Sequence, residues 1–199
     1  MITRKEMTRM LLKEGLLSWL ANNSFETVTV TSLCKASGIT RSTFYLHYSN
    51  IREIVDDLVD DAIAYSKPGM VDNNNLQTIA NTLSAASNSV SLREAYDSIF
   101  DRLPLCQRII RHKKYLPLFL DEQISEYVLQ RIIGREKDRQ GLVMAESLGV
   151  SFDVGVSVFV FLVHGLYAVN KRYKWSQSDE WLEAQKIIFE LVYRGLQSR

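Results

Sequence analysis

The sequence has few prolines, few cysteines and no long uncharged apolar run. Its three prolines among 199 residues favour long helices over a fold rich in loops. Cys34 and Cys106 are far apart and do not form a disulfide framework, which suits a reducing compartment. Because no stretch of about 18 uncharged apolar residues is present, we expect no membrane span. The charged N-terminus lacks the apolar core of a signal peptide, so we expect a cytoplasmic protein.

The motifs of common enzymes are also missing. The sequence contains no Gly-rich phosphate loop, no H-E-x-x-H and no G-x-S-x-G. The three histidines, His47, His112 and His164, and the two cysteines show no metal-ligand spacing. We therefore expect no enzymatic activity, no metal site and no cofactor.

Residues 28–48 contain two short helical patterns around a tight turn. Small or apolar residues recur at helical spacing in the first pattern, and Gly38 can adopt the positive φ that ends a helix. Thr40 is placed to cap the second helix. Within that helix Phe44 and Tyr48 share a face that we expect to pack on the first helix. The exposed polar N-terminus of the second helix is typical of a helix-turn-helix, in which those residues meet base edges in the major groove.

The same stretch resembles the tetracycline-repressor (TetR) family of transcription regulators. The family pattern is close to T-V-x-x-I-A-x-x-A-G-V-S-x-x-T-x-Y-x-H-F, and this chain follows it at Thr29, Val30, Leu33, Cys34, Ser37, Gly38, Ile39, Thr40, Thr43, Tyr45, His47 and Tyr48. Its Arg-Ser-Thr-Phe-Tyr version, residues 41–45, resembles one subset of the family. The resemblance is sharp over roughly residues 10–60 and architectural beyond them.

The resemblance implies an all-α homodimer with two domains. Residues 1–66 would form a three-helix helix-turn-helix domain, and residues 67–199 a larger helical domain for dimerisation and effector binding. Lys67-Pro68-Gly69 marks the boundary, because proline and glycine together stop a helix. The last two long helices of each copy would form a four-helix bundle.

We expect ten residues to contact DNA. They are Thr29, Thr31, Thr40, Arg41, Ser42, Thr43, Tyr45, His47, Asn50 and Arg52. Arg41 can reach a base or a phosphate, whereas Tyr45 and His47 stand where the family's tyrosine and histidine contact phosphates. Ile51 replaces the lysine with which the family meets a phosphate, so Arg52, or the Asn50 amide with the helix N-terminus, is expected to serve instead.

The charge distribution fits a DNA-facing N-terminal end. Residues 1–52 contain seven lysines and arginines and three acidic residues, a net charge of +4, although the whole chain carries only +1. Residues 53–61 contain five acidic residues. A basic end beside an acidic one is expected of a DNA-binding unit, but solvated helix faces would give the same pattern.

Apolar periodicity predicts helices in most of the remaining chain. The expected ranges are 5–22, 51–65, a weak helix within 72–91, 92–103, 118–133, 151–173 and 178–197, with 134–149 as a flexible connection. The helix at 151–173 is apolar nearly all round and should be buried on more than one side. The residues expected at a dimer interface are Phe152, Val156, Phe159, Val163, Trp181, Ile188 and Leu191.

The resemblance implies an effector cavity among the helices of the larger domain. Its candidate lining residues are Tyr96, Phe100, Phe119, Tyr127, Phe159, His164 and Tyr167. Each of these residues taken singly is better explained as part of an ordinary core.

We predict that the protein is a DNA-binding transcription regulator. It would act as a repressor that binds an inverted-repeat operator in double-stranded DNA and leaves it when a small-molecule effector binds. Two alternatives stay open. In the first, the larger domain docks a partner protein, which would make the chain a co-regulator or activator. In the second, motivated by Ile51 and the near-neutral net charge, a small-molecule-binding helical protein no longer binds DNA.

Overall fold

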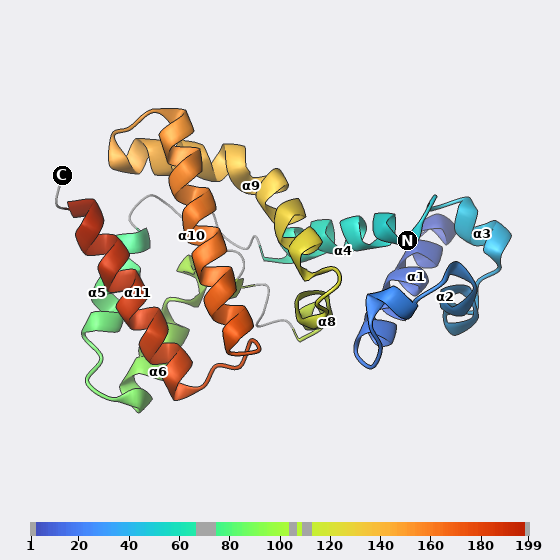
Figure 1. Cartoon of the computed structure of the whole chain (residues 1–199), viewed down its shortest axis with the longest axis horizontal. Coiled ribbons are helices and arrows are strands. Elements are labelled where there is room, and N and C mark those ends of the chain that lie inside the picture. The colour runs from blue at the N-terminus through green and yellow to red at the C-terminus, as the bar shows by residue number, and fades with distance from the viewer. Residues whose placement is uncertain (1–2, 67–74, 104–106, 109–112, 198–199) are drawn as a thin grey trace. The chain divides into compact units, whose positions relative to one another are not determined.

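The computed structural model is all-helical over the residues it describes, which are 3–66, 75–103, 107–108 and 113–197 (Figure 1). This confirms the all-α class. The elements in chain order are α1 (Arg4–Leu20), the 3-10 helix η1 (Phe25–Thr27), α2 (Val30–Ser37), α3 (Arg41–Tyr45), α4 (Ile51–Tyr65), α5 (Asn75–Ser84), α6 (Ser89–Ser98), the 3-10 helix η2 (Phe100–Arg102), α8 (Leu116–Leu120), α9 (Ser125–Leu148), α10 (Phe152–Arg172) and α11 (Asp179–Gln197). Lys67-Pro68-Gly69, Cys106 and His112 lie outside the described residues.

The chain forms two compact units. Unit 1 consists of Met1–Tyr65 and Ile109–Ile132, and unit 2 of Ser66–Arg108 and Ile133–Arg199. Unit 1 therefore contains, besides the expected N-terminal segment, residues that the sequence pattern had grouped with the larger domain. Helix α9 begins in unit 1 and ends in unit 2.

A hydrogen bond and an ion pair explain why the second segment belongs to unit 1. The Asp121 carboxylate accepts a hydrogen bond from the Phe25 backbone N–H at 2.7 Å, across 96 positions of sequence. Lys114 pairs with Glu14 of α1 at 2.5 Å. These contacts join α8 and its flanks to α1 and η1.

The acidic face of α4 is used inside unit 1. Asp56 accepts a hydrogen bond from the Tyr127 hydroxyl at 2.7 Å and pairs with Arg131 of α9 at 2.8 Å. On the α1 side, Arg9 pairs with Asp57, and Lys13 pairs with Asp61. These carboxylates pair with arginine and lysine side chains of α1 and α9. They therefore hold both helices against α4, and their negative charges are balanced within unit 1.

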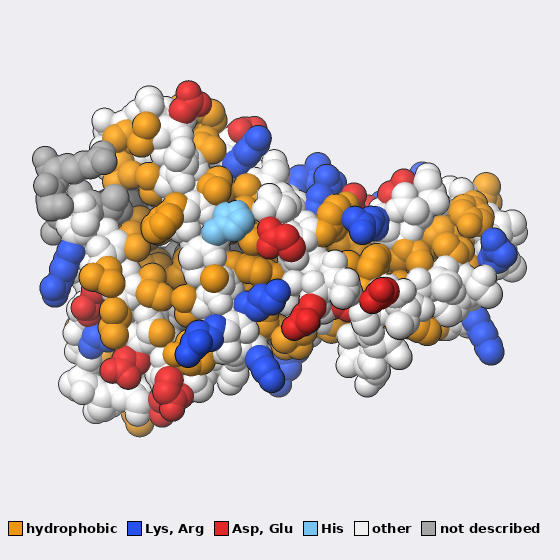
Figure 2. Space-filling view, in the orientation of Figure 1, with side chains coloured by type: hydrophobic (Ala, Val, Ile, Leu, Met, Phe, Trp, Pro, Cys, Tyr) orange, Lys and Arg blue, Asp and Glu red, His pale blue; other side chains and the backbone are white. Residues whose placement is uncertain are grey.

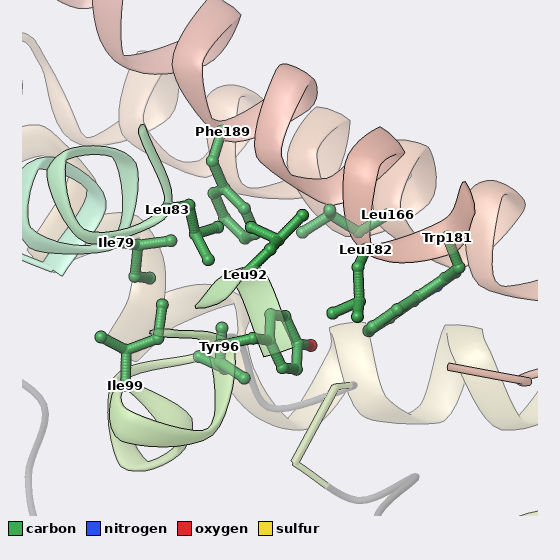
Figure 3. Packing of buried hydrophobic residues seen from close by; sticks show 10 residues of the cluster. Ile79, Leu83, Leu92, Tyr96, Ile99, Leu166, Trp181, Leu182 and Phe189 are labelled. Atoms are coloured by element: carbon green, nitrogen blue, oxygen red, sulfur yellow. The ribbon is translucent and has the colours of Figure 1, made fainter. Parts of the chain in front are cut away.

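The core of unit 2 lies between α5, α6, α10 and α11. Helix α11 packs on both α5 and α6, and their apolar side chains point toward one another around Leu92 (Figure 3). The buried members of this cluster are Ile79, Leu83, Leu92, Tyr96, Ile99, Leu103, Leu166, Trp181, Leu182 and Phe189. The helices of unit 2 thus enclose one apolar centre.

The prediction of a flexible connection at 134–149 is wrong, because α9 runs without a break to Leu148. The glycine at 141 permits a close crossing with α10. A Cβ built on Gly155 of α10 would lie 2.3 Å from the Gly141 carbonyl oxygen and 2.7 Å from the Ala145 nitrogen. Glycine here removes side-chain bulk where two helix backbones meet, and does not interrupt the helix.

Two other expected helices are divided differently. The weak helix within 72–91 ends at Ser84, and α6 begins at Ser89, because Asn88 caps it by accepting a hydrogen bond from the Ser91 N–H at 2.9 Å. The helix expected over 118–133 is two helices, which are separated around Asp121. Asp121 also accepts a hydrogen bond from the Gln123 N–H at 2.9 Å, which favours a turn over a continued helix.

Helix α10 is long and apolar enough to cross a membrane, by length and composition only. Only 28% of its most apolar stretch is buried within the chain. One such helix is weak evidence, because the core helix of a soluble protein has the same length and composition. Apolar side chains gather over α10 and α11 in the view of Figure 2.

Candidate nucleic-acid interface

The α2–turn–α3 segment forms as its sequence predicts. The Thr29 side chain caps α2 by accepting a hydrogen bond from the Ser32 N–H at 3.0 Å. Gly38 ends α2 with φ of 65°, a conformation that costs a side-chain-bearing residue energy. Thr40 then caps α3 by accepting from the Thr43 N–H at 3.2 Å. Local hydrogen bonds therefore define both helices and the turn between them.

Buried side chains on one face of α3 fix its orientation. Phe44 and Tyr48 are both buried, as their spacing predicts. The Tyr48 hydroxyl donates a 2.6 Å hydrogen bond to Asp57 of α4. Burial, and secondarily the Asp57 carboxylate, raises the pKa of Tyr48 well above its ordinary value, so the hydroxyl stays protonated. Arg9 lies over the Tyr48 ring with 5.3 Å from its guanidinium carbon to the centroid.

Most of the expected DNA-contacting residues are exposed in unit 1. The exposed ones are Thr29, Thr31, Thr40, Arg41, Ser42, Tyr45, Asn50 and Arg52, and the half-buried ones are Thr43 and His47. The Thr40 hydroxyl lies 2.9 Å from that of Ser42 and 2.8 Å from that of Thr43. The Nδ1 atom of His47 is enclosed and has no hydrogen-bond partner among the described residues.

An open hollow of about 500 Å³ brings four of these residues together. We call it the α2–α4 hollow. Its lining residues are Phe25, Val28, Thr29, Val30, Tyr45, Ser49, Asn50, Ile51 and Arg52. The N-termini of α2 and α4 both contribute, since Thr29 caps α2 and the Asn50 side chain accepts from the Glu53 N–H at 3.2 Å. Two helix N-termini at one open surface favour an anion there.

Neighbouring aromatic rings orient two side chains of the hollow. The Tyr45 ring meets buried Phe44 edge-on, with centroids 5.2 Å apart. The Arg52 guanidinium lies over the Tyr127 ring at 5.3 Å, a cation–π arrangement. Tyr127 itself had been expected at an effector pocket, but within unit 1 it supports Arg52 and Asp56.

The expected pocket residues fall into different compact units. Phe119 and Tyr127 belong to unit 1, whereas Tyr96, Phe100, Phe159, His164 and Tyr167 belong to unit 2. In unit 2 the Tyr96 ring packs edge-on against Trp181 at 5.1 Å between centroids, and the Tyr167 ring packs against Trp175 at 5.3 Å.

Five polar side chains lie inside the unit 2 core, in two hydrogen-bonded sets. The Tyr96 hydroxyl donates to the Gln107 carbonyl, and Gln107 Nε2 donates to Gln185 Oε1 at 2.5 Å. Trp181 Nε1 donates to Asn170 Oδ1 at 2.8 Å. Gln185 and Asn170 are fully buried, and their amide nitrogens have no hydrogen-bond partner among the described residues. We define these five residues as the buried polar chain.

Sequence reasoning missed the buried polar chain. A signal was present, because Gln185 follows Trp181 by four positions and so lies on the apolar face of its helix. The same face of α11 carries Leu182 and Phe189 of the core cluster.

The seven expected dimer residues differ in exposure. Phe152 and Leu191 are exposed, and Val156 and Ile188 are half-buried. Phe159, Val163 and Trp181 are buried in the core of their own chain. Among the described residues, no group of three or more His, Cys, Asp or Glu side chains is placed to hold a metal ion.

A comparison of the sequence with protein-family models finds no match, and a comparison with curated proteins finds no relative.

Proposed function

We propose that the protein is a TetR-like transcription regulator in which α2 and α3 form a helix-turn-helix and α3 enters the major groove of DNA. One observation carries the proposal: the capped, exposed end of α3 lies in the same unit as a hollow at which two helix N-termini meet. Arg41 and Ser42 would then face base edges or phosphates. Binding of labelled duplex DNA across a salt series tests it.

The α2–α4 hollow supplies the sequence-independent part of binding. Backbone N–H groups at the starts of α2 and α4, the Tyr45 hydroxyl and the Arg52 guanidinium suit a DNA phosphate. Ile51 adds apolar surface at this place, where a lysine would add a charge. Phosphate binding would therefore depend on the N-termini of α2 and α4, the Tyr45 hydroxyl and one arginine, Arg52.

Dimerisation is proposed through the outer faces of α10 and α11. Phe161 is 72% exposed and Leu191 67% exposed in the single chain. Along α10, Phe161 follows Val154 by seven positions and Gly165 follows Phe161 by four. This helical spacing places the three residues on one stripe. A Cβ on Gly165 would meet nothing within 4 Å, so a second helix can approach closely. Two recognition helices roughly 34–36 Å apart would then match two half-sites.

Phe161→Glu is expected to convert the protein to a monomer without unfolding it, because the side chain is mostly exposed in one chain but would be buried in a dimer. Sedimentation equilibrium of both proteins measures the change. Val90→Glu is the matched control, because Val90 of α6 is also exposed but lies outside the stripe. A dimeric Phe161→Glu protein would contradict the proposed interface. A monomeric wild type would favour a docked partner protein on this face.

The effector would bind at the buried polar chain of unit 2. The enclosed amide N–H₂ groups of Gln185 and Asn170 have no partners among the described residues, which costs free energy, roughly 1–3 kcal/mol each, unless a ligand accepts their hydrogen bonds. A ligand with carbonyl or carboxylate oxygens and an apolar body would pair with Gln185 and Asn170 beside the Tyr96–Trp181 rings. Coupling of about 1–3 kcal/mol would change operator occupancy 5- to 150-fold.

Gln185→Met is expected to weaken binding of such an effector by roughly tenfold, since the Nε2 donor is lost at nearly constant volume. The change also removes the Oε1 acceptor of Gln107, so we expect the folded variant to be less stable than the wild type as well. Small carboxylates and amides that raise the thermal midpoint of the wild type are titrated into both proteins by calorimetry. Circular dichroism shows whether the variant is folded. Equal affinity for both folded proteins would contradict this site.

A further inference from the structure

Leu46 is unusual among the apolar residues of unit 1. It is 79% exposed, the largest value for any large hydrophobic side chain among the described residues. It closes α3 at the C-cap with right-handed helical angles, φ of −73° and ψ of −16°. Its position therefore continues the helical geometry of α3, and its side chain follows the same periodicity.

The face of α3 on which Leu46 lies is defined by its neighbours. Phe44 is buried, and two residues of helix turn the side-chain direction by about 200°. Leu46 and Ser42 each stand two positions from Phe44, and both are exposed. Because they are four positions apart, they share one face. This outward face runs from a hydroxyl at Ser42 to a hydrocarbon at Leu46.

Leu46 offers a hydrocarbon side chain where the rest of the outer face is polar. It can neither donate to a base acceptor nor pair with a phosphate. Among the base edges of the major groove, the apolar group is the C5-methyl of thymine. We propose that Leu46 packs on a thymine methyl group in each half-site and so requires thymine at one operator position. This inference rests on the proposed DNA-binding function.

The test removes the methyl group from the DNA and the side chain from the protein. Duplexes bound by the full-length wild type are first selected from a random library. Each thymine of the selected site is then replaced singly by deoxyuridine, which lacks only the C5-methyl. Dissociation constants are measured for the wild type, Leu46→Ala and Leu120→Ala at one salt concentration.

For the wild type, we expect one deoxyuridine position per half-site to weaken binding roughly three- to fourfold, as expected for one buried methyl group. Leu46→Ala should bind more weakly overall and lose this sensitivity at that position alone. Leu120 of α8 is also exposed, so Leu120→Ala should keep the wild-type sensitivity. Thermal unfolding of Leu46→Ala should match the wild type, since the side chain is mostly in solvent.

Three results would overturn the inference. One is an equal deoxyuridine effect in the wild type and Leu46→Ala, and another is the absence of any sensitive thymine. In both cases DNA is bound, so the proposed function stands and the role of Leu46 alone fails. If the folded wild type selects no DNA, the proposed function and the inference fail together.

Discussion

Replacing Phe44 with alanine is expected to lower the free energy of unfolding by about 3–5 kcal/mol and to abolish DNA binding. The ring is fully buried in unit 1, and truncation of a buried phenylalanine leaves a cavity as well as losing apolar transfer energy. The ring also supports exposed Tyr45 edge-on. Its loss would therefore disturb the orientation of α3 even in the molecules that stay folded.

Urea unfolding, followed by circular dichroism, measures the effect on stability. Arg41→Ala is the matched control, because Arg41 belongs to the same short helix but is exposed. We expect this control to weaken DNA binding while unfolding at nearly the wild-type urea concentration. A stable Phe44→Ala variant that binds DNA normally would refute the orientation of α3.

Gly155→Ala should destabilise unit 2 by about 1–3 kcal/mol, although alanine is the better helix former. The new Cβ would lie within 3 Å of the Gly141 oxygen and of the Ala145 nitrogen and Cβ. Two of these atoms belong to the α9 backbone, so side-chain rotation cannot relieve the overlap. The helices would have to separate along their crossing.

Gly134→Ala, in α9, is expected to change stability in the opposite direction. A Cβ at Gly134 meets no atom within 4 Å, so only helix propensity remains and stability should rise by roughly 0.5–1 kcal/mol. Thermal unfolding of the two variants and the wild type measures both effects, a lower melting temperature for Gly155→Ala and a higher one for Gly134→Ala. Stabilisation by Gly155→Ala would show that α9 and α10 do not cross this closely.

Features that depend on local hydrogen bonds could be predicted from the sequence. The caps at Thr29 and Thr40 and the left-handed Gly38 are each determined within a few residues. The burial of Phe44 and Tyr48 follows from their spacing on one helix face. Such features need no knowledge of the rest of the chain.

Features that depend on distant partners could not be predicted in this way. Gly141 carries the same local signal whether a helix ends or another helix crosses it, and only α10 decides between them. The Phe25–Asp121 hydrogen bond joins residues 96 positions apart. For the same reason, the burial of Gln185, whose amide nitrogen has no hydrogen-bond partner among the described residues, emerges only when the helices of unit 2 are packed together.

The most direct test of DNA binding is fluorescence anisotropy with labelled duplex DNA from upstream of the protein's own gene. We would titrate the wild type, Tyr45→Ala and Ile51→Lys between about 50 and 200 mM salt. The wild type should bind with an affinity that falls steeply as salt rises, and Tyr45→Ala should bind more weakly at every salt concentration. Ile51→Lys should bind more tightly, with the salt slope steeper by about one for each protomer. A folded wild type that binds no DNA at low salt, and still binds none as Ile51→Lys, would contradict the account.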